Sequence, residues 1–262
     1  MLEVIDKGSA TEAHPVPLLF VHGVAHAAWC WDDHFLDYFA NNGYRALALS
    51  LRGHGRSPTS KPLLNCSIAD YVDDLHSVAK NLPVSPVVVG HSVGGYVVQK
   101  YLEKAHAPAA VLIASIPVHG ARGFAMRGAR RHPWLLAKSI VTRDSLQMLN
   151  TPALARQAFF CAQTPEPIVV QSVSRLGDAS DYRALLDMCF LSLPKPTLVT
   201  TPMLVLGAEC DGSITQDEVR ATAHAYQAEV EFFPNMGHDM MLEPRWEEVA
   251  ERIDGWLKAQ GL

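Results

Sequence analysis

One short string of the sequence carries residues suited to nucleophilic catalysis. An apolar run, Val87–Val89, leads into a Gly-x-Ser-x-Gly pattern that places Ser92 between Gly90 and Gly94, ahead of a helical pattern. A serine on a sharp turn from a buried strand to a helix has a strained backbone and needs small neighbours two residues away on each side. The N-terminus of the helix directs free N–H groups and a positive dipole end toward such a serine. We therefore predict that Ser92 is a nucleophile.

A serine hydroxyl attacks efficiently only when a base accepts its proton and a third group orients that base. Among the twelve histidines, His238 lies in a loop after the last apolar run and before the C-terminal helical pattern. Loops at the carboxyl ends of parallel strands gather the sites of α/β proteins, so we predict that His238 is the base. Asp211 follows the preceding apolar run and is the predicted acid. Glu209 is the alternative, whereas Asp217 fits the first turn of a helix.

The negative charge that develops on a carbonyl oxygen needs two backbone N–H donors. One is expected from Val93, the residue after the nucleophile, and the other from a loop after an earlier strand. That loop begins at His22 and Gly23, which follow an apolar run ending at Val21, so Val24 is the expected second donor. One such donor typically stabilises the transition state by about 3–4 kcal/mol.

The elements that must position these residues follow from hydropathy. Short apolar runs bounded by Gly, Pro or Ser alternate with amphipathic stretches of helical period. Continuous apolar runs are typical of strands buried on both faces, and strand–helix alternation indicates an open α/β sheet. We predict a mostly parallel sheet covered by helices on both faces. The predicted strands are 16–21, 45–50, 86–89, 109–114, 202–206 and 230–233, and the clearest helices are 67–81, 94–104 and 245–258.

This alternation stops between residues 116 and 196, where prolines divide the chain into short helical pieces. We predict one core domain from 1–115 and 197–262, with 116–196 as a helical cap or lid over one end of the sheet. The cap holds ten of the 22 basic and five of the 27 acidic residues, which leaves 12 and 22 in the core. We interpret its charge as solvated helix faces docked on an acidic body. The alternative is that a cluster of Arg127, Arg130, Arg131 and His132 recognises an anionic substrate or a lipid surface.

The composition excludes several classes of protein. The chain has 262 residues, of which 48% are hydrophobic and 19% charged, with a net charge of −5, so neither disorder nor a nucleic-acid partner is expected. No apolar run is long enough to span a membrane, and residues 1–10 do not form a secretory signal. The five cysteines are widely spaced without a Cys-x-x-Cys pattern. We expect reduced thiols, no metal site and a cytoplasmic location.

Together these motifs resemble the α/β-hydrolase superfamily, specifically its small intracellular serine esterases with a helical cap. The likeness covers about 16–115 and 200–260. Two segments resemble those of one branch, the plant methylesterases and hydroxynitrile lyases. They are His22–Trp31, which reads HGVAHAAWCW, and His238–Leu242. The resemblance implies an α/β-hydrolase fold with a cap inserted after the sixth-strand position, a Ser-His-Asp triad and no cofactor. Asp239 stands where the lyases of that branch have a lysine, which argues against lyase activity.

We therefore predict a serine hydrolase that cleaves a small to medium carboxylic ester through an acyl-enzyme. The choice of ester over amide is implied by the resemblance. The small-molecule substrate is expected to contact residues of the loop after the first buried strand and large apolar residues of the cap. These are His22, Gly23, His26, Trp29, Met126, Trp134, Phe159 and Phe160. For Trp29, packing at the start of a helix is the alternative.

Two other classes of function remain open. The same triad supports C–C bond hydrolysis, lactone opening, perhydrolysis or hydroxynitrile cleavage. A receptor-like member of the fold would instead hold its ligand with little turnover. The sequence leaves the oligomeric state open.

Overall fold

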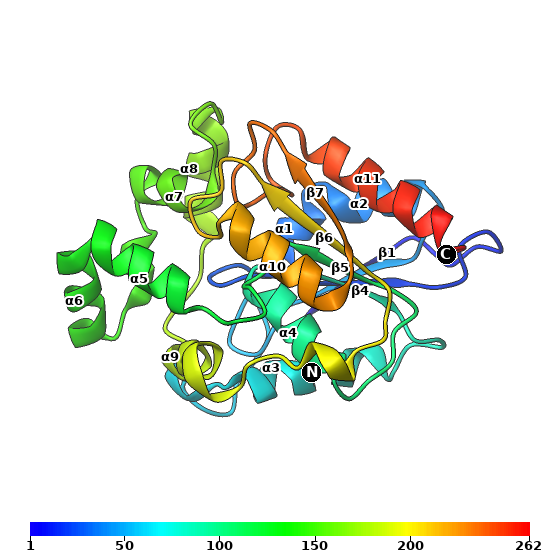
Figure 1. Cartoon of the computed structure of the whole chain (residues 1–262), viewed down its shortest axis with the longest axis horizontal. Helices are drawn as coiled ribbons and strands as arrows, with labels where there is room; N and C mark the ends of the chain where they lie inside the picture. Colours follow the sequence, from blue (N-terminus) through cyan, green and yellow to red (C-terminus); the bar gives the residue numbers. More distant parts are fainter.

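The computed structural model describes residues 1–262. Seven strands form one sheet in the order β1-β3-β2-β4-β5-β6-β7, in which β1 is antiparallel to β3 and every other neighbouring pair is parallel (Figure 1). The prediction of a mostly parallel α/β sheet is therefore confirmed. The strands are β1 (Val4–Lys7), β2 (Leu18–Val21), β3 (Ala46–Leu49), β4 (Val87–His91), β5 (Ala110–Ile113), β6 (Met203–Ala208) and β7 (Glu229–Phe233).

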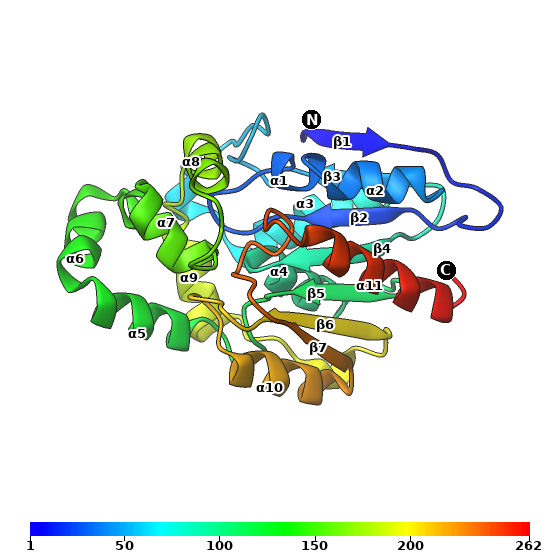
Figure 2. The ribbon, with the colours of Figure 1, turned by 90° about the horizontal axis from the view of Figure 1, so that it is seen from above.

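Helices cover both faces of this sheet (Figures 1 and 2). One face packs against α1 (Trp29–Asp32), α2 (Phe35–Asn41) and α11 (Trp246–Ala259), and the other against α3 (Ile68–Ala79), α4 (Val93–Tyr101) and α10 (Gln216–Tyr226). Within β2, Leu18 and Phe20 join the core on one face, while Leu19 and Val21 join the core on the other. Because side chains of a strand alternate between faces, burial on both sides requires a continuous apolar run.

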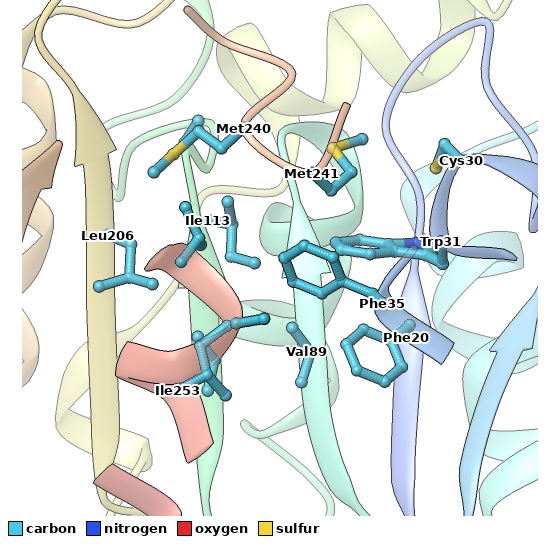
Figure 3. Packing of buried hydrophobic residues seen from close by; sticks show 14 of the residues in the cluster. Phe20, Cys30, Trp31, Phe35, Val89, Ile113, Leu206, Met240, Met241 and Ile253 are labelled. Carbon is cyan, nitrogen blue, oxygen red and sulfur yellow. The ribbon is translucent and has the colours of Figure 1, made fainter. Parts of the chain in front are cut away.

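The loop after His238 is anchored in the first of these cores. Met240 and Met241 are fully buried there; in Figure 3, Met240 lies near Ile113, and Met241 lies near the rings of Trp31 and Phe35. The rings of Phe20 and Trp31 in the same core are tilted, with centroids 5.0 Å apart. The apolar residues that follow His238 therefore fix its loop to the sheet.

A run of helices separates β5 from β6 and projects beyond the carboxyl ends of the parallel strands (Figure 2). They are α5 (Arg122–Arg131), α6 (Pro133–Thr142), α7 (Pro152–Phe159), α8 (Glu166–Arg175) and α9 (Tyr182–Leu186). They occupy the region 116–196 that we propose as the cap. The strand that precedes this region is β5, the fifth strand in chain order. No helix in the chain combines the length and the apolar character needed to cross a membrane.

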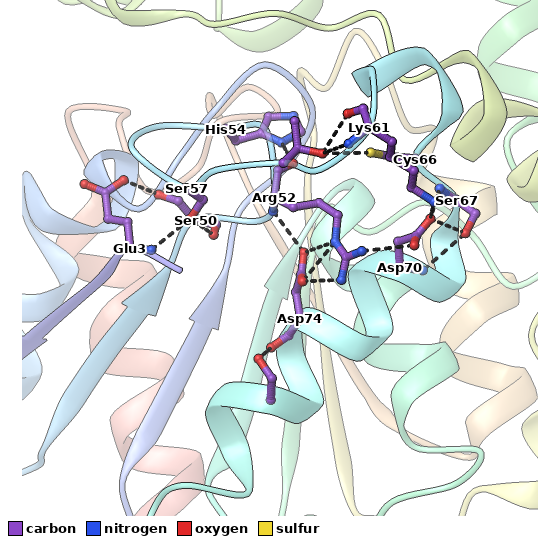
Figure 4. A network of polar contacts seen from close by, with 12 residues as sticks. Glu3, Ser50, Arg52, His54, Ser57, Lys61, Cys66, Ser67, Asp70 and Asp74 are labelled. Carbon is purple, nitrogen blue, oxygen red and sulfur yellow. Dashed lines mark hydrogen bonds and ion pairs between the residues drawn. The ribbon is translucent and has the colours of Figure 1, made fainter. Parts of the chain in front are cut away.

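The turn after β3 is braced by Arg52 (Figure 4). Its guanidinium donates to Asp74 at 2.6 Å and to Asp70 at 3.0 Å, and its backbone N–H donates to Asp74 at 2.9 Å. Both acids lie on α3, so Arg52 ties the carboxyl edge of the sheet to that helix. The nearby Arg56 pairs with Glu3, but its side chain is 85% exposed.

We expect Arg52→Met to lower the free energy of unfolding by about 2–3 kcal/mol, because Asp74 is buried and loses charged donors. The control Arg56→Met removes an exposed cation and should cost less than about 1 kcal/mol, because Glu3 keeps Ser50 Oγ and the backbone N–H of residue 56 as donors. Urea unfolding followed by circular dichroism measures both values. Equal losses in the two variants would show that Arg52 does not brace the turn.

Candidate active site

The turn that carries Ser92 has the strained geometry predicted for it. β4 ends at His91, α4 begins at Val93, and Ser92 between them has φ +52° and ψ −116°. A Cβ at Gly90 would lie 2.5 Å from the carbonyl oxygen of Gly94, and a Cβ at Gly94 would lie 2.5 Å from that of His22. Both glycines are therefore required by close backbone approach, and the packing holds the serine at the tip of the turn.

Asp211 and His238 form a buried pair. His238 Nδ1 donates to Asp211 Oδ2 at 2.8 Å, and the backbone N–H groups of Ser213 and Ile214 donate to Asp211 Oδ1 at 2.7 and 2.8 Å. The side chains of Asp211 and His238 are 1% and 2% exposed. This arrangement fixes the tautomer of the imidazole so that Nε2 presents a lone pair. The alternatives Glu209 and Asp217 are exposed to solvent.

The surroundings of His238 also set its affinity for a proton. Burial lowers the pKa of the imidazole, but the charge and hydrogen bond of Asp211, with a smaller contribution from Asp239, raise the pKa above its ordinary value of 6.5. A base with a raised pKa accepts a proton more readily at the moment when the serine gives one up.

The loop of His238 is attached to the residue that precedes Ser92. His91 Nε2 donates to the carbonyl oxygen of His238 at 3.0 Å, and the two rings have centroids 4.7 Å apart. Neither Ser92 Oγ nor His238 Nε2 has a hydrogen-bond partner within the protein, so no direct bond joins the two. Such contacts are often long before substrate binds. The structure thus places an oriented Asp–His pair beside the turn that carries the serine.

The two expected oxyanion donors lie on either side of Ser92. Val93 is the first residue of α4, so its N–H has no acceptor within the helix. Val24 follows Gly23, whose added Cβ would lie 3.0 Å from the Cβ of Ser92. Val24, Ser92 and Val93 all line one cavity of about 200 Å³. Their shared position agrees with the donor roles that we propose for the two valines.

The walls of this cavity come mostly from the helical segment and are apolar. Fourteen of the nineteen lining residues are hydrophobic, so the cavity favours a hydrocarbon group. They include Phe124, Leu136, Met148, Leu149, Leu185 and Met188.

None of the eight predicted substrate-contact residues lines this cavity, and their contact with a substrate stays a prediction. Met126 is 53% exposed and Trp134 is 80% exposed, because the helices of the cap turn these side chains to solvent. On α5, Phe124, Ala125 and Gly128 form the face toward the cavity. That spacing of three and four residues is a helical stripe, so helical phase rather than side-chain size was the signal in the sequence.

The remaining predicted contact residues have structural positions. His22 is fully buried and accepts from the N–H of Leu51 at 3.0 Å, and Gly23 packs against the serine turn. The guanidinium of Arg175 lies over the ring of Trp29, with Cζ 4.0 Å from the ring centroid. Phe160 is buried in the core, whereas Phe159 stacks on His238, with ring centroids 5.9 Å apart. Of the eight, Phe159 therefore supports the predicted base directly.

A second buried acid–histidine pair, His26 with Asp239, was not predicted from the sequence. His26 Nδ1 lies 2.8 Å from the carbonyl oxygen of Val24, and Nε2 lies 3.1 Å from Asp239 Oδ2. Both partners are acceptors, so each ring nitrogen carries a proton and His26 is an imidazolium paired with the Asp239 carboxylate. Burial opposes both charges, but the pairing raises the pKa of His26 and lowers the pKa of Asp239. The pair joins the Val24 loop to the His238 loop.

His91 lies against this pair in a different protonation state. Burial and the neighbouring His238 lower the pKa of His91 to about 3, so its ring is neutral. One ligand atom each from His91, His238 and Asp239 lies within 4.8 Å of the others. His91 Nε2 already donates to a carbonyl, however, and Asp239 is paired with His26. We therefore assign no metal to these residues.

The basic cluster of the cap holds the cap against the core. Arg127 pairs with Glu218 at 2.7 Å and donates to the carbonyl of Ser213, while Arg131 donates to the carbonyl of Gly212 at 2.6 Å. His132 bonds Gln157 within the cap, and Arg130 is exposed. These contacts favour docking of the cap on the core over recognition of an anionic ligand.

A family model described as "Alpha/beta hydrolase family" matches residues 18–252. The chain belongs to the alpha/beta hydrolase family. It is 37% identical to methylesterase 18 of Arabidopsis thaliana over 79 residues, which cover 29% of each chain, and 34% identical to a non-heme chloroperoxidase of Streptomyces lividans over 106 residues. The latter match covers 39% of this chain and 37% of that relative, so both cover well under two thirds of the relative.

The solved structures of alpha/beta hydrolases support the fold of the whole chain. A putative non-heme bromoperoxidase from Mycobacterium tuberculosis H37Rv superimposes with a TM-score of 0.79 at 20% identity, covering 99% of this chain and 96% of the other. The expected family resemblance is thus confirmed, including the likeness to plant methylesterases.

We expect His26→Ala to lower the free energy of unfolding by about 3–5 kcal/mol, because it leaves the Asp239 carboxylate buried without its cation. The control Asp37→Ala removes an exposed pair with Lys7 and should cost less than about 1 kcal/mol. Urea unfolding measures both. A loss in His26→Ala no larger than in the control would contradict the ion pair.

Proposed function

We propose that this alpha/beta hydrolase is a serine hydrolase that cleaves small to medium carboxylic esters. The observation that carries the proposal is the buried Asp211–His238 hydrogen bond beside the strained turn that presents Ser92 to a cavity. A nucleophile, an oriented base and free backbone donors are the parts that acyl transfer needs.

In the proposed reaction, Ser92 Oγ attacks the carbonyl carbon of the ester while its proton passes to His238 Nε2. Asp211 holds the imidazole and stabilises the imidazolium that forms. The backbone N–H groups of Val24 and Val93 bind the oxyanion of the tetrahedral intermediate. When the ester bond breaks, His238 returns the proton to the leaving alcohol. Water then attacks the acyl-enzyme with His238 as base, which releases the acid and restores the serine.

Size and wall chemistry support this class of substrate. A cavity of about 200 Å³ is smaller than the roughly 300–1,000 Å³ of typical drug-sized sites, and its walls are mostly hydrocarbon. A short acyl or aryl group fits that description. The similarity to a plant methylesterase is consistent with an ester of a small alcohol.

Hydroxynitrile cleavage is the less favoured use of the same triad. The lyases that the sequence resembles place a lysine next to the base, whereas Asp239 here is a buried carboxylate paired with His26. A carboxylate at that position repels cyanide instead of holding it. Analysis of the products from candidate esters, lactones and hydroxynitriles separates these chemistries.

The first test is hydrolysis of p-nitrophenyl esters with acyl chains of two to twelve carbons. The wild-type protein and the Ser92→Ala variant are compared at the same concentration. We expect kcat to fall about 10⁶-fold in the variant, because the serine and its base act as one unit. The acyl-chain length with the highest rate would report the size of the group that the cavity accepts. Equal rates in both proteins would contradict Ser92 as the nucleophile.

The second test is Asp211→Asn, which should reduce kcat/KM about 10⁴-fold by favouring the wrong imidazole tautomer. The neutral imidazole is the active base, so wild-type activity should fall as pH drops through an apparent pKa above 6.5. Removing the Asp211 charge should move that acid limb to lower pH. The control Glu209→Gln should change neither quantity. A silent Asp211→Asn beside a severe Glu209→Gln would assign the acid to Glu209.

A further inference from the structure

The cavity beside Ser92 has a single charged lining residue. Asp181 immediately precedes α9, and it is the only Asp, Glu, Lys or Arg among the nineteen residues that line the cavity. It is 7% exposed. Removing a carboxylate from water to this extent is costly unless hydrogen-bond donors replace the water.

The protein supplies few such donors. Tyr71 Oη donates to Asp181 Oδ2 at 3.0 Å, whereas Asp181 Oδ1 has no hydrogen-bond partner within the protein. The basic side chain within 4.0 Å of this carboxylate is His54, whose Nε2 lies 4.0 Å from Oδ2, outside hydrogen-bond distance. The neighbouring Arg183 is paired with Asp187 at 3.0 Å. Asp181 therefore keeps an acceptor that no other residue uses.

Two other polar side chains of the cavity, Tyr182 and Ser139, are occupied within the cap. Tyr182 Oη donates to the carbonyl of Ser139 at 2.8 Å, and Ser139 Oγ donates to the carbonyl of Leu136 at 2.9 Å. Neither hydroxyl proton is directed to Asp181. Oδ1 of Asp181 is therefore available to a hydrogen-bond donor on a group that enters the cavity.

We propose that Asp181 selects substrates whose cavity-bound group carries a hydrogen-bond donor, either a hydroxyl or an ammonium, and rejects those that carry a carboxylate. This inference rests on the proposed function, in which the ester carbonyl lies at Ser92. The hydrocarbon of the substrate would contact the apolar walls while its donor reaches Asp181. A carboxylate in the same place would meet a like charge that is shielded from water.

Binding to the catalytically inactive Ser92→Ala protein tests the proposal without turnover. The probes are hexylammonium, 1-hexanol and hexanoate, measured by isothermal titration calorimetry. We expect hexylammonium or 1-hexanol to bind at least about tenfold more tightly than hexanoate, because a donor to a buried charge is worth that factor or more. In Ser92→Ala with Asp181→Asn, which keeps an acceptor for Tyr71, this ratio should fall below about threefold. The two donor probes distinguish a preference for a cation from a preference for a hydroxyl.

Kinetics give the second measurement. Ethyl esters of six-carbon acids ending in methyl, hydroxymethyl, ammonium or carboxylate groups are compared by kcat/KM in wild type, Asp181→Asn and Asp187→Asn. Asp187 is a buried carboxylate that does not line the cavity, so its variant should keep the wild-type order of substrates. Asp181→Asn should raise the relative rate of the carboxylate ester at least about tenfold.

The outcomes separate the two proposals. Three outcomes would each overturn the role of Asp181. Hexanoate binds as tightly as the donor probes, none of the probes binds, or the ratio of donor-probe to hexanoate affinity is unchanged in Asp181→Asn. Ester hydrolysis that persists in Ser92→Ala would overturn the proposed serine mechanism alone, because the calorimetry does not depend on catalysis.

Discussion

The turn at Ser92 imposes the constraint that the rest of the molecule satisfies. A non-glycine residue at φ +52° is held there only if its surroundings leave no alternative. The backbone of α4 therefore packs directly onto β4 and onto the end of β2, through the two glycines that flank the serine. This close approach of backbones requires rigid strands whose two faces are both covered by packed side chains. The two apolar cores on either side of the sheet provide that rigidity.

Two buried carboxylates near the turn, Asp211 and Asp239, have different partners and different roles. Asp211 accepts two backbone N–H groups and the imidazole, so its charge is fully hydrogen-bonded on the core side of the site. Asp239 is next in sequence to His238 but faces away, toward His26. One acid thus orients the base, and the other ties the base to the loop that holds Val24. The two charges together favour a protonated His238.

The sequence predicted the parts of the fold that depend on local composition. Strands β2 to β6 are continuous apolar runs, whereas β1 was missed because Val4–Lys7 is a half-buried edge strand with charged residues. The place after a strand pointed to a loop that holds both Asp211, the predicted acid, and Glu209, and the structure places Asp211 against His238. The pairing of His26 with Asp239 joins positions 213 residues apart, which no local pattern reveals. Substrate contacts in the cap were predicted from the size of side chains such as Trp134, which is exposed, whereas the residues that line the cavity follow the phase of the helix.

The bonds from the cap to the loop of Asp211 have a mechanical consequence. Arg127 and Arg131 grip the carbonyl oxygens of Ser213 and Gly212, the residues just after the acid. An outward swing of α5 would have to break these bonds, and it would also free the loop that follows Asp211 from its contact with the cap. A movement of this helix would therefore be thermodynamically linked to the alignment of the base.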